Sequence, residues 1–126
     1  MGKLIKAIDT VKPQIMTINY IEDKYTYVSI NLNICLLTDG TFAYDKIELP
    51  DWALNNIHEA DDETKYSVLI VHIINAYYNE HQMTAILSNY MVEPDNEKYV
   101  KEFNDMQKIR KLAKDTANEI ITNKLF

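Results

Sequence analysis

Strict alternation between apolar and polar residues runs through one segment of the first half of the chain. The apolar positions are Val28, Ile30, Leu32, Ile34 and Leu36, and the positions between them hold Ser29, Asn31, Asn33 and Cys35. Because successive side chains of a β-strand point to opposite faces, this period of two predicts a strand with one buried and one wetter face. Such a strand requires neighbouring strands and a second layer that covers its apolar face.

The residues after this strand predict a tight turn into a second strand. A three-residue loop at 38–40, with Gly40 in the left-handed conformation, places Phe42 opposite Leu36 on the apolar face. A two-residue Asp-Gly loop would put Phe42 on the polar face instead, so we predict the three-residue loop. The apolar phase of the second strand then slips by one residue, which predicts a β-bulge at residues 45–46.

Two more segments complete the predicted N-terminal half. Alternate apolar residues at Met16, Ile18 and Tyr20 predict a third strand, so that residues 14–49 form a three-stranded antiparallel meander. Residues 1–12 have apolar side chains at helical spacing and are followed by Pro13, which disfavours helix at the residue before it. These features predict a short helix over residues 1–12.

From Pro50 onward the apolar residues recur at the three- and four-residue steps of amphipathic helices. Asp61 to Glu63 are typical of a helix start, and we predict a helix from Asp62 whose continuity to Tyr90 the sequence leaves open. Pro94 favours the first turn of a new helix after a loop at 92–95. Residues 51–126 are therefore expected to be helical and to form a hairpin of long amphipathic helices.

The predicted fold is a single α+β domain spanning residues 1–126, in which the N-terminal three-stranded antiparallel meander packs with the C-terminal helical hairpin. A helix of 25 residues is about 38 Å long, whereas a globule made from this chain is only about 36 Å across. The hairpin should therefore overhang the sheet. The overhang would leave apolar surface for a second copy or a protein partner.

Charge is distributed unevenly along the chain. The net charge is −6, and the segment from Asp39 to Glu63 holds eight acids against Lys46 alone, so that it carries −7. With Arg110 as the only arginine, this balance argues against direct nucleic-acid binding, which needs many cationic contacts to phosphates. The acidic segment could instead imitate the phosphate charge of DNA, although helix capping accounts for three of its acids.

The sequence contains no recognisable catalytic or cofactor motif. With only Gly2 and Gly40 it cannot build a glycine-rich phosphate loop, and Cys35 lies in the middle of a predicted strand, where a small apolar role is commoner than catalysis. The histidines His58, His72 and His81 match no metal-binding spacing. We therefore predict no enzyme activity, no cofactor and no metal. A single cysteine and the lack of a long apolar run favour a cytoplasmic protein without membrane contact.

Three sets of side chains are candidates for binding. The polar sheet face could hold a ligand through Asn31 and Asn33, although an exposed antiparallel face is polar in any case. A basic cluster on the last helix suits an anion, and a solvated helix face explains it equally well; it consists of Lys108, Arg110, Lys111 and Lys114. Aromatic residues of the helices suit a partner interface, except where the core needs them; they are Tyr77, Tyr78, Tyr90, Tyr99 and Phe103.

Excess amphipathic helix without a catalytic constellation favours a small non-enzymatic interaction or assembly protein that forms oligomers. The composition is typical of AT-rich coding, so that a phage-encoded assembly factor or an inhibitor of a host defence protein is the favoured setting. The alternative is a protein that binds a small molecule or a nucleotide signal. A third hypothesis is an acidic inhibitor that imitates DNA.

Overall fold

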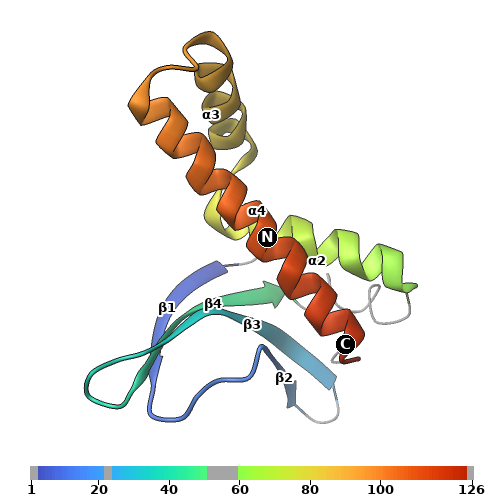
Figure 1. Cartoon of the computed structure of the whole chain (residues 1–126). Helices are drawn as coiled ribbons and strands as arrows, with labels where there is room; N and C mark the ends of the chain where they lie inside the picture. The colour runs from blue at the N-terminus through green and yellow to red at the C-terminus, as the bar shows by residue number, and fades with distance from the viewer. Residues whose placement is uncertain (1–2, 22–23, 51–59, 125–126) are drawn as a thin grey trace.

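The computed structural model describes residues 3–21, 24–50 and 60–124. Within these ranges the chain forms a four-stranded antiparallel sheet and three helices (Figure 1), which confirms the α+β class. The elements are β1 (Lys3–Asp9), β2 (Met16–Ile21), β3 (Lys24–Leu36), β4 (Phe42–Pro50), α2 (Asp62–Tyr77), α3 (Glu80–Val92) and α4 (Glu97–Thr122). The helical prediction for residues 51–59 lies outside the described residues.

Strand order in the sheet is β1-β4-β3-β2. Strands β2, β3 and β4 form the predicted meander, but a fourth strand lies beside β4, and the predicted N-terminal helix is wrong. Residues Lys3 to Asp9 pair with β4 from Glu48 to Phe42. A short isolated helix is only marginally stable in water, whereas this pairing satisfies the strand's backbone groups along the open edge of β4.

The core lies between one face of the sheet and the two helices α2 and α4 that cover it (Figure 1). Val28, Ile30 and Leu32 of β3 face it, together with Ile47 and Leu49 of β4. On the helical side, the fully buried residues include Leu69, Ile73, Ala113, Ala117 and Ile120. Two alanines at this contact allow the backbones of α2 and α4 to approach closely, because their side chains add little volume.

The turn between β3 and β4 is the predicted three-residue loop. The Leu37 N–H donates to the Thr41 carbonyl at 2.8 Å, Gly40 has a φ of 86°, and Leu36 pairs with Phe42. Aspartate fixes the loop as well, since the Asp39 carboxylate accepts a hydrogen bond from the Thr41 hydroxyl at 2.6 Å.

Substituting Gly40 tests this turn, because a β-carbon added there meets no atom within 4 Å and only the backbone conformation opposes it. We expect Gly40→Ala to lower the free energy of unfolding by about 1 to 2 kcal/mol, measured by urea denaturation. Gly40→Asn should cost clearly less, because asparagine tolerates the left-handed region. Equal losses for the two variants would contradict this account of the turn.

The predicted bulge exists but lies on the other strand. Leu32 pairs with Asp45 and Cys35 pairs with Ala43, so that two residues of β3, Asn33 and Ile34, stand opposite one residue of β4. The prediction at residues 45–46 was therefore wrong. Asn33 has a φ of 53°, and asparagine adopts this left-handed conformation more readily than most residues, which places the irregularity on β3.

Helix boundaries follow side-chain caps. Asp61 caps α2 as predicted, with its carboxylate accepting from the Thr64 N–H at 2.7 Å. The open question of continuity is resolved by a break at Tyr78, after which Asn79 and Gln82 form a reciprocal capping box at 2.8 Å in both directions. Helix α4 begins at Glu97 with Asn96 as its cap, so Pro94 lies in the loop and not in the first turn as predicted.

Helix α3 and the N-terminal half of α4 project away from the sheet as an arm (Figure 1). Helix α3 contains no buried residue, and the ring of Tyr90 stacks on that of Phe103 with centroids 4.2 Å apart. This is the overhang expected from helix length. None of the described helices combines the length and the apolar character needed to cross a membrane.

Candidate functional site

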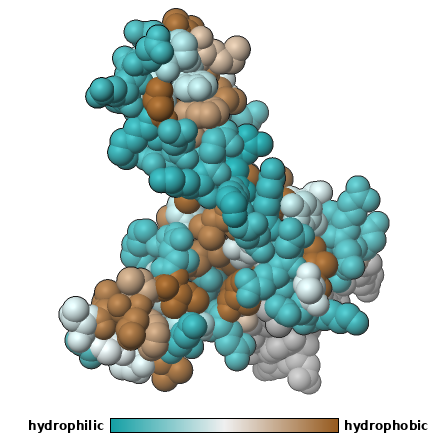
Figure 2. All heavy atoms as spheres, viewed as in Figure 1, coloured by the Kyte–Doolittle hydropathy of each residue, from teal (hydrophilic) through white to brown (hydrophobic). Residues whose placement is uncertain are grey.

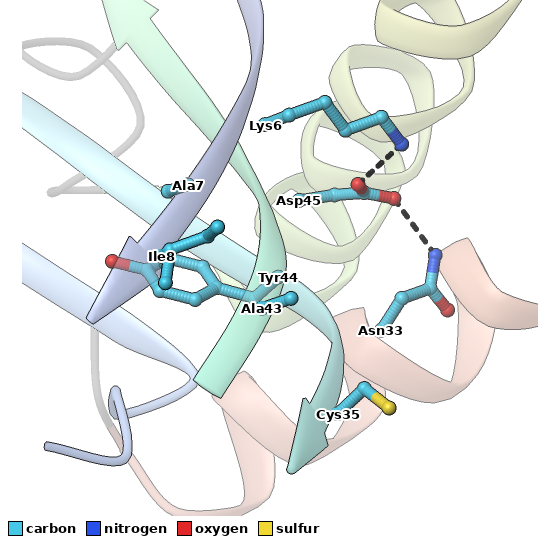
Figure 3. A pocket seen from close by; sticks show the side chains of 8 residues that line it. All are labelled: Lys6, Ala7, Ile8, Asn33, Cys35, Ala43, Tyr44 and Asp45. Atoms are coloured by element: carbon cyan, nitrogen blue, oxygen red, sulfur yellow. Dashed lines mark hydrogen bonds and ion pairs between the residues drawn. The ribbon is translucent and has the colours of Figure 1, made fainter. Parts of the chain in front are cut away.

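The buried carboxylate of Asp45 is the centre of a hydrogen-bond network between the sheet and the helical layer. The side chain of Asp45 in β4 is only 9% exposed, and Lys6 of β1 donates to its Oδ1 at 2.6 Å. Its Oδ2 accepts from the hydroxyl of Tyr77 in α2 at 2.7 Å and from Nδ2 of Asn33 in β3 at 2.9 Å. Figure 3 shows Lys6 and Asn33 reaching Asp45 from two sides. One carboxylate thus joins three strands and a helix.

The electrostatics of this group follow from its partners. Burial alone would raise the pKa of Asp45, but the hydrogen bonds from Lys6, Asn33 and Tyr77 outweigh burial and lower it. Burial, followed by the hydrogen bond to Asp45, raises the pKa of Tyr77. At neutral pH the network therefore consists of an ionised carboxylate that accepts and a protonated phenol that donates.

Asn33 is held in one orientation by the same network. Because a carboxylate only accepts, the Asn33 Nδ2 must face Asp45, and it also lies 3.3 Å from the Tyr77 hydroxyl. The Asn33 Oδ1 consequently points away from Asp45 (Figure 3) and accepts no hydrogen bond from any described residue. The left-handed bulge therefore presents a fixed, exposed acceptor at the edge of the sheet.

Three open hollows meet at Asn33. The first, of about 320 Å³, lies on the sheet and is drawn in Figure 3; its lining includes Lys6, Ile8, Ala43 and Asp45. The second, of about 310 Å³, lies between β3, α4 and the segment before β2, and its lining includes Lys12, Ile15, Asn31 and Thr116. The third, also of about 310 Å³, lies against α4 and is lined by Lys108, Ile109, Lys111, Leu112 and Asp115 together with Asn33.

Asn31 adds a further irregularity to the same stretch of β3. It is 4% exposed, and its Nδ2 donates to the Gln14 carbonyl at 2.6 Å. Its Oδ1 has no hydrogen-bond partner among the described residues, and the same holds for the buried hydroxyl of Ser29. Buried polar atoms without partners are rare in folded proteins. Together with the bulge and the buried carboxylate, they mark this part of β3 as a candidate site.

The structure brings together four of the six predicted ligand-binding residues. Asn31 and Asn33 line the second hollow, and Asn33 lines the third with Lys108 and Lys111. Arg110 and Lys114 are on the same helix but line none of these three hollows. The sequence did not single out Asp45, Lys6 or Tyr77 as a network. The only sequence feature that pointed to this network was the position of Asp45 in β4, where the alternation of apolar residues shifts by one.

The aromatic residues predicted to bind a partner have other contacts. Tyr77 belongs to the Asp45 network, and Tyr90 and Phe103 stack on each other within the arm. Tyr78 and Tyr99 are half-buried. The large apolar side chains that are exposed on the arm are instead those of Leu87, Met91 and Val92. The interface role of the aromatic residues stays a prediction.

The residues that could act in catalysis or metal binding do not converge in the described part of the chain. Cys35 is exposed beside the first hollow, His81 is exposed, and His72 is half-buried, with burial lowering its pKa. Among the described ranges, no three side chains of the His, Cys, Asp or Glu type gather closely enough to hold a metal ion. His58 lies outside those ranges.

No protein-family model, no curated protein and no solved structure matches this chain. Its function is therefore inferred from its own residues and geometry.

Proposed function

We propose that this chain is a small non-enzymatic assembly protein that associates with a second copy of itself through the arm. The observation that carries this proposal is the apolar free end of the arm, where Met91 is 77% exposed, Val92 79% and Leu87 39%. Figure 2 shows apolar surface at this end of the molecule, far from the core. A helix that contributes no buried residue to its own fold supports a role between molecules.

Contacts within the arm hold its helices in place, so that binding through these side chains has a low cost in conformational entropy. The stacked rings of Tyr90 and Phe103 join α3 to α4, and the Asn79 and Gln82 capping box fixes the start of α3. A pre-organised helical surface loses little conformational freedom on binding. Burial of an aliphatic or methionine side chain contributes about 1.5 to 3 kcal/mol, so a few such residues at an interface have a large effect.

We do not favour the hypothesis of DNA imitation, because acids of the segment also serve the fold of this chain itself. Several acids of the segment from Asp39 to Glu63 have local partners: Asp39 closes a turn, Asp45 is buried in its network and Asp61 caps α2. Of these three acids only Asp45 is buried, whereas Asp39 and Asp61 are exposed and keep their charge at the surface. A phage-encoded assembly factor or inhibitor of a host protein remains the setting that the composition favours.

A substitution at the arm tip tests this proposal. We expect the wild-type protein to run as a dimer or larger species in light scattering after gel filtration, at low and at high salt, because an apolar interface is not screened. Met91→Lys combined with Val92→Lys should raise the dissociation constant more than about 100-fold. The mass should then fall to that of the monomer.

Ser67→Lys combined with Asn118→Lys is the control for added charge, because both residues are exposed on helices α2 and α4 outside the arm. This variant should keep the wild-type mass, and circular dichroism should report unchanged helix content for both double variants. A wild-type protein that stays monomeric at about 100 µM, where even a micromolar interface would be filled, would refute self-association through the arm.

A further inference from the structure

We propose that the second and third hollows, which share Asn33 and Leu112, form one binding site for a small anionic ligand that also carries an N–H donor. We call this site the Asn33 notch. A nucleoside monophosphate has the required chemistry, since its phosphate supplies the anion and its base supplies the N–H donor. This site is separate from the arm tip and does not depend on the proposed self-association.

The acceptor of the notch is the Asn33 amide oxygen. Hydrogen bonds from Nδ2 to Asp45 at 2.9 Å and to Tyr77 at 3.3 Å hold the amide, so that the oxygen is fixed without a ligand. A fixed acceptor that faces open space selects a donor and costs no side-chain ordering on binding. The bulge at Asn33 directs this side chain out of the regular alternation of β3.

The cations of the notch come from two separate parts of the chain. Lys108 lines the third hollow and forms no ion pair with a described residue, and Lys12 lines the second hollow. Lys111 pairs with Asp115 at 2.7 Å, but both side chains are mostly exposed at 78% and 62%, so the pair is weak and can be exchanged for an anion. The lining therefore holds three cations, Lys12, Lys108 and Lys111, against two carboxylates, Asp115 and Glu119, a net charge of +1 in a chain whose net charge is −6. This locally positive balance suits an anionic ligand.

The dimensions and the apolar lining fit a small molecule. Each hollow has a volume of about 310 Å³, and the two have a common wall at Asn33 and Leu112. Ligand sites typically span about 300 to 1,000 Å³ and combine an apolar lining with a few convergent polar groups. Ile15 and Leu112 provide that lining, and Thr116 adds a hydroxyl.

Amide NMR titration of the isotope-labelled full chain tests the notch. The probes are the monophosphates of adenosine, guanosine, cytidine and uridine, the corresponding nucleosides, and inorganic phosphate. We expect at least one monophosphate to bind with a dissociation constant below about 1 mM and to shift the signals of Asn33, Lys108 and Leu112. The nucleosides lack the anion and phosphate lacks the N–H donor, so each should bind at least about tenfold more weakly.

Two variants assign the contacts. Asn33→Gly keeps the left-handed backbone and removes the amide, and should raise the dissociation constant about tenfold. Lys108→Gln with Lys111→Gln should raise it by a similar factor and reduce its dependence on salt. The matched control is Lys98→Gln with Lys101→Gln in the first turns of α4, away from the notch. It also breaks an i,i+4 pair, Lys101 with Asp105 at 2.8 Å, and should leave binding within about twofold of wild type.

Several outcomes would overturn the proposal. One is no binding of any monophosphate up to about 1 mM, where even weak specific binding would be visible. Others are phosphate or a nucleoside binding as tightly as the best monophosphate, or shifts confined to another surface. If Asn33→Gly disturbs the fold, the surface lysine pair still decides the question, because unchanged affinity in that variant would exclude the notch.

Discussion

Replacing Ile73 with alanine is expected to lower the free energy of unfolding by about 3 to 4 kcal/mol, a large share of the stability of a domain of this size. Ile73 is fully buried in the C-terminal half of α2, in the cluster that joins this helix to β3, β4 and α4. Alanine removes three carbon atoms and leaves a cavity that the rigid sheet cannot fill. Urea denaturation followed by circular dichroism measures the loss.

Val71→Ala is the matched control for this prediction. Val71 is two residues away on the same helix, is also β-branched, and is 53% exposed. Its replacement should change the free energy of unfolding by less than about 0.5 kcal/mol, since alanine also has the higher helix propensity. If the two variants were equally stable, α2 would not pack on the sheet through the face that contains Ile73.

Where one physical cause dominates locally, the sequence predicted the structure correctly. Alternation of side chains identified β3, and Val28, Ile30 and Leu32 of its predicted apolar face are buried. The predicted contrast between the two faces was wrong in part, because Ser29 and Asn31 of the polar face are also buried and Leu36 of the apolar face is 65% exposed. The left-handed requirement at Gly40 identified the loop type, and the short polar side chain of Asp61 identified the start of α2. In each case a backbone constraint acts over a few residues and needs no knowledge of distant contacts.

Predictions failed where a distant partner decides the local structure. The apolar spacing in residues 1–12 fits a helix, but β4 offers an open edge about forty residues later in the chain, and pairing with it makes β1 a strand. The bulge was assigned to the wrong strand for a similar reason. The slip in apolar phase is visible in β4, whereas the residue that absorbs it is Asn33 in β3, because of its tolerance for a positive φ.

The sequence predicted some residues of the candidate site but not how they come together. Asn31 and Asn33 were selected from a polar strand face, and Lys108 and Lys111 from a basic helix, as two separate sets. Their meeting depends on how α4 crosses β3, which no local pattern encodes. The network around Asp45 could not be predicted from the sequence. A polar residue at the point where the apolar alternation of a strand shifts by one resembles a surface residue. In addition, the three partners of Asp45 are 12 or more residues away in the sequence.

Removing the Asp45 carboxylate is the second substitution with a large expected effect. We expect Asp45→Ala to lower the free energy of unfolding at neutral pH by about 3 kcal/mol, because it takes the acceptor from Tyr77 and Asn33 and breaks a charge-assisted contact with Lys6. The loss should not be much larger, because the Lys6 side chain is 77% exposed and its charge is solvated by water when Asp45 is removed. Asp115→Ala, which breaks an exposed pair on α4, should cost less than about 1 kcal/mol.

The pH dependence separates this role from simple loss of packing. The folded protein holds the pKa of Asp45 below its ordinary value, so in acid the unfolded chain binds a proton more readily than the folded one. The stability from Asp45 is therefore fully present above the ordinary pKa of about 3.8 and is lost as pH falls through the lower folded value. The difference in unfolding free energy between wild type and Asp45→Ala should thus be constant from neutral pH down to about pH 5 and shrink below about pH 4. A difference that stayed constant throughout the acid range would mean that the network holds Asp45 by shape and not by its charge.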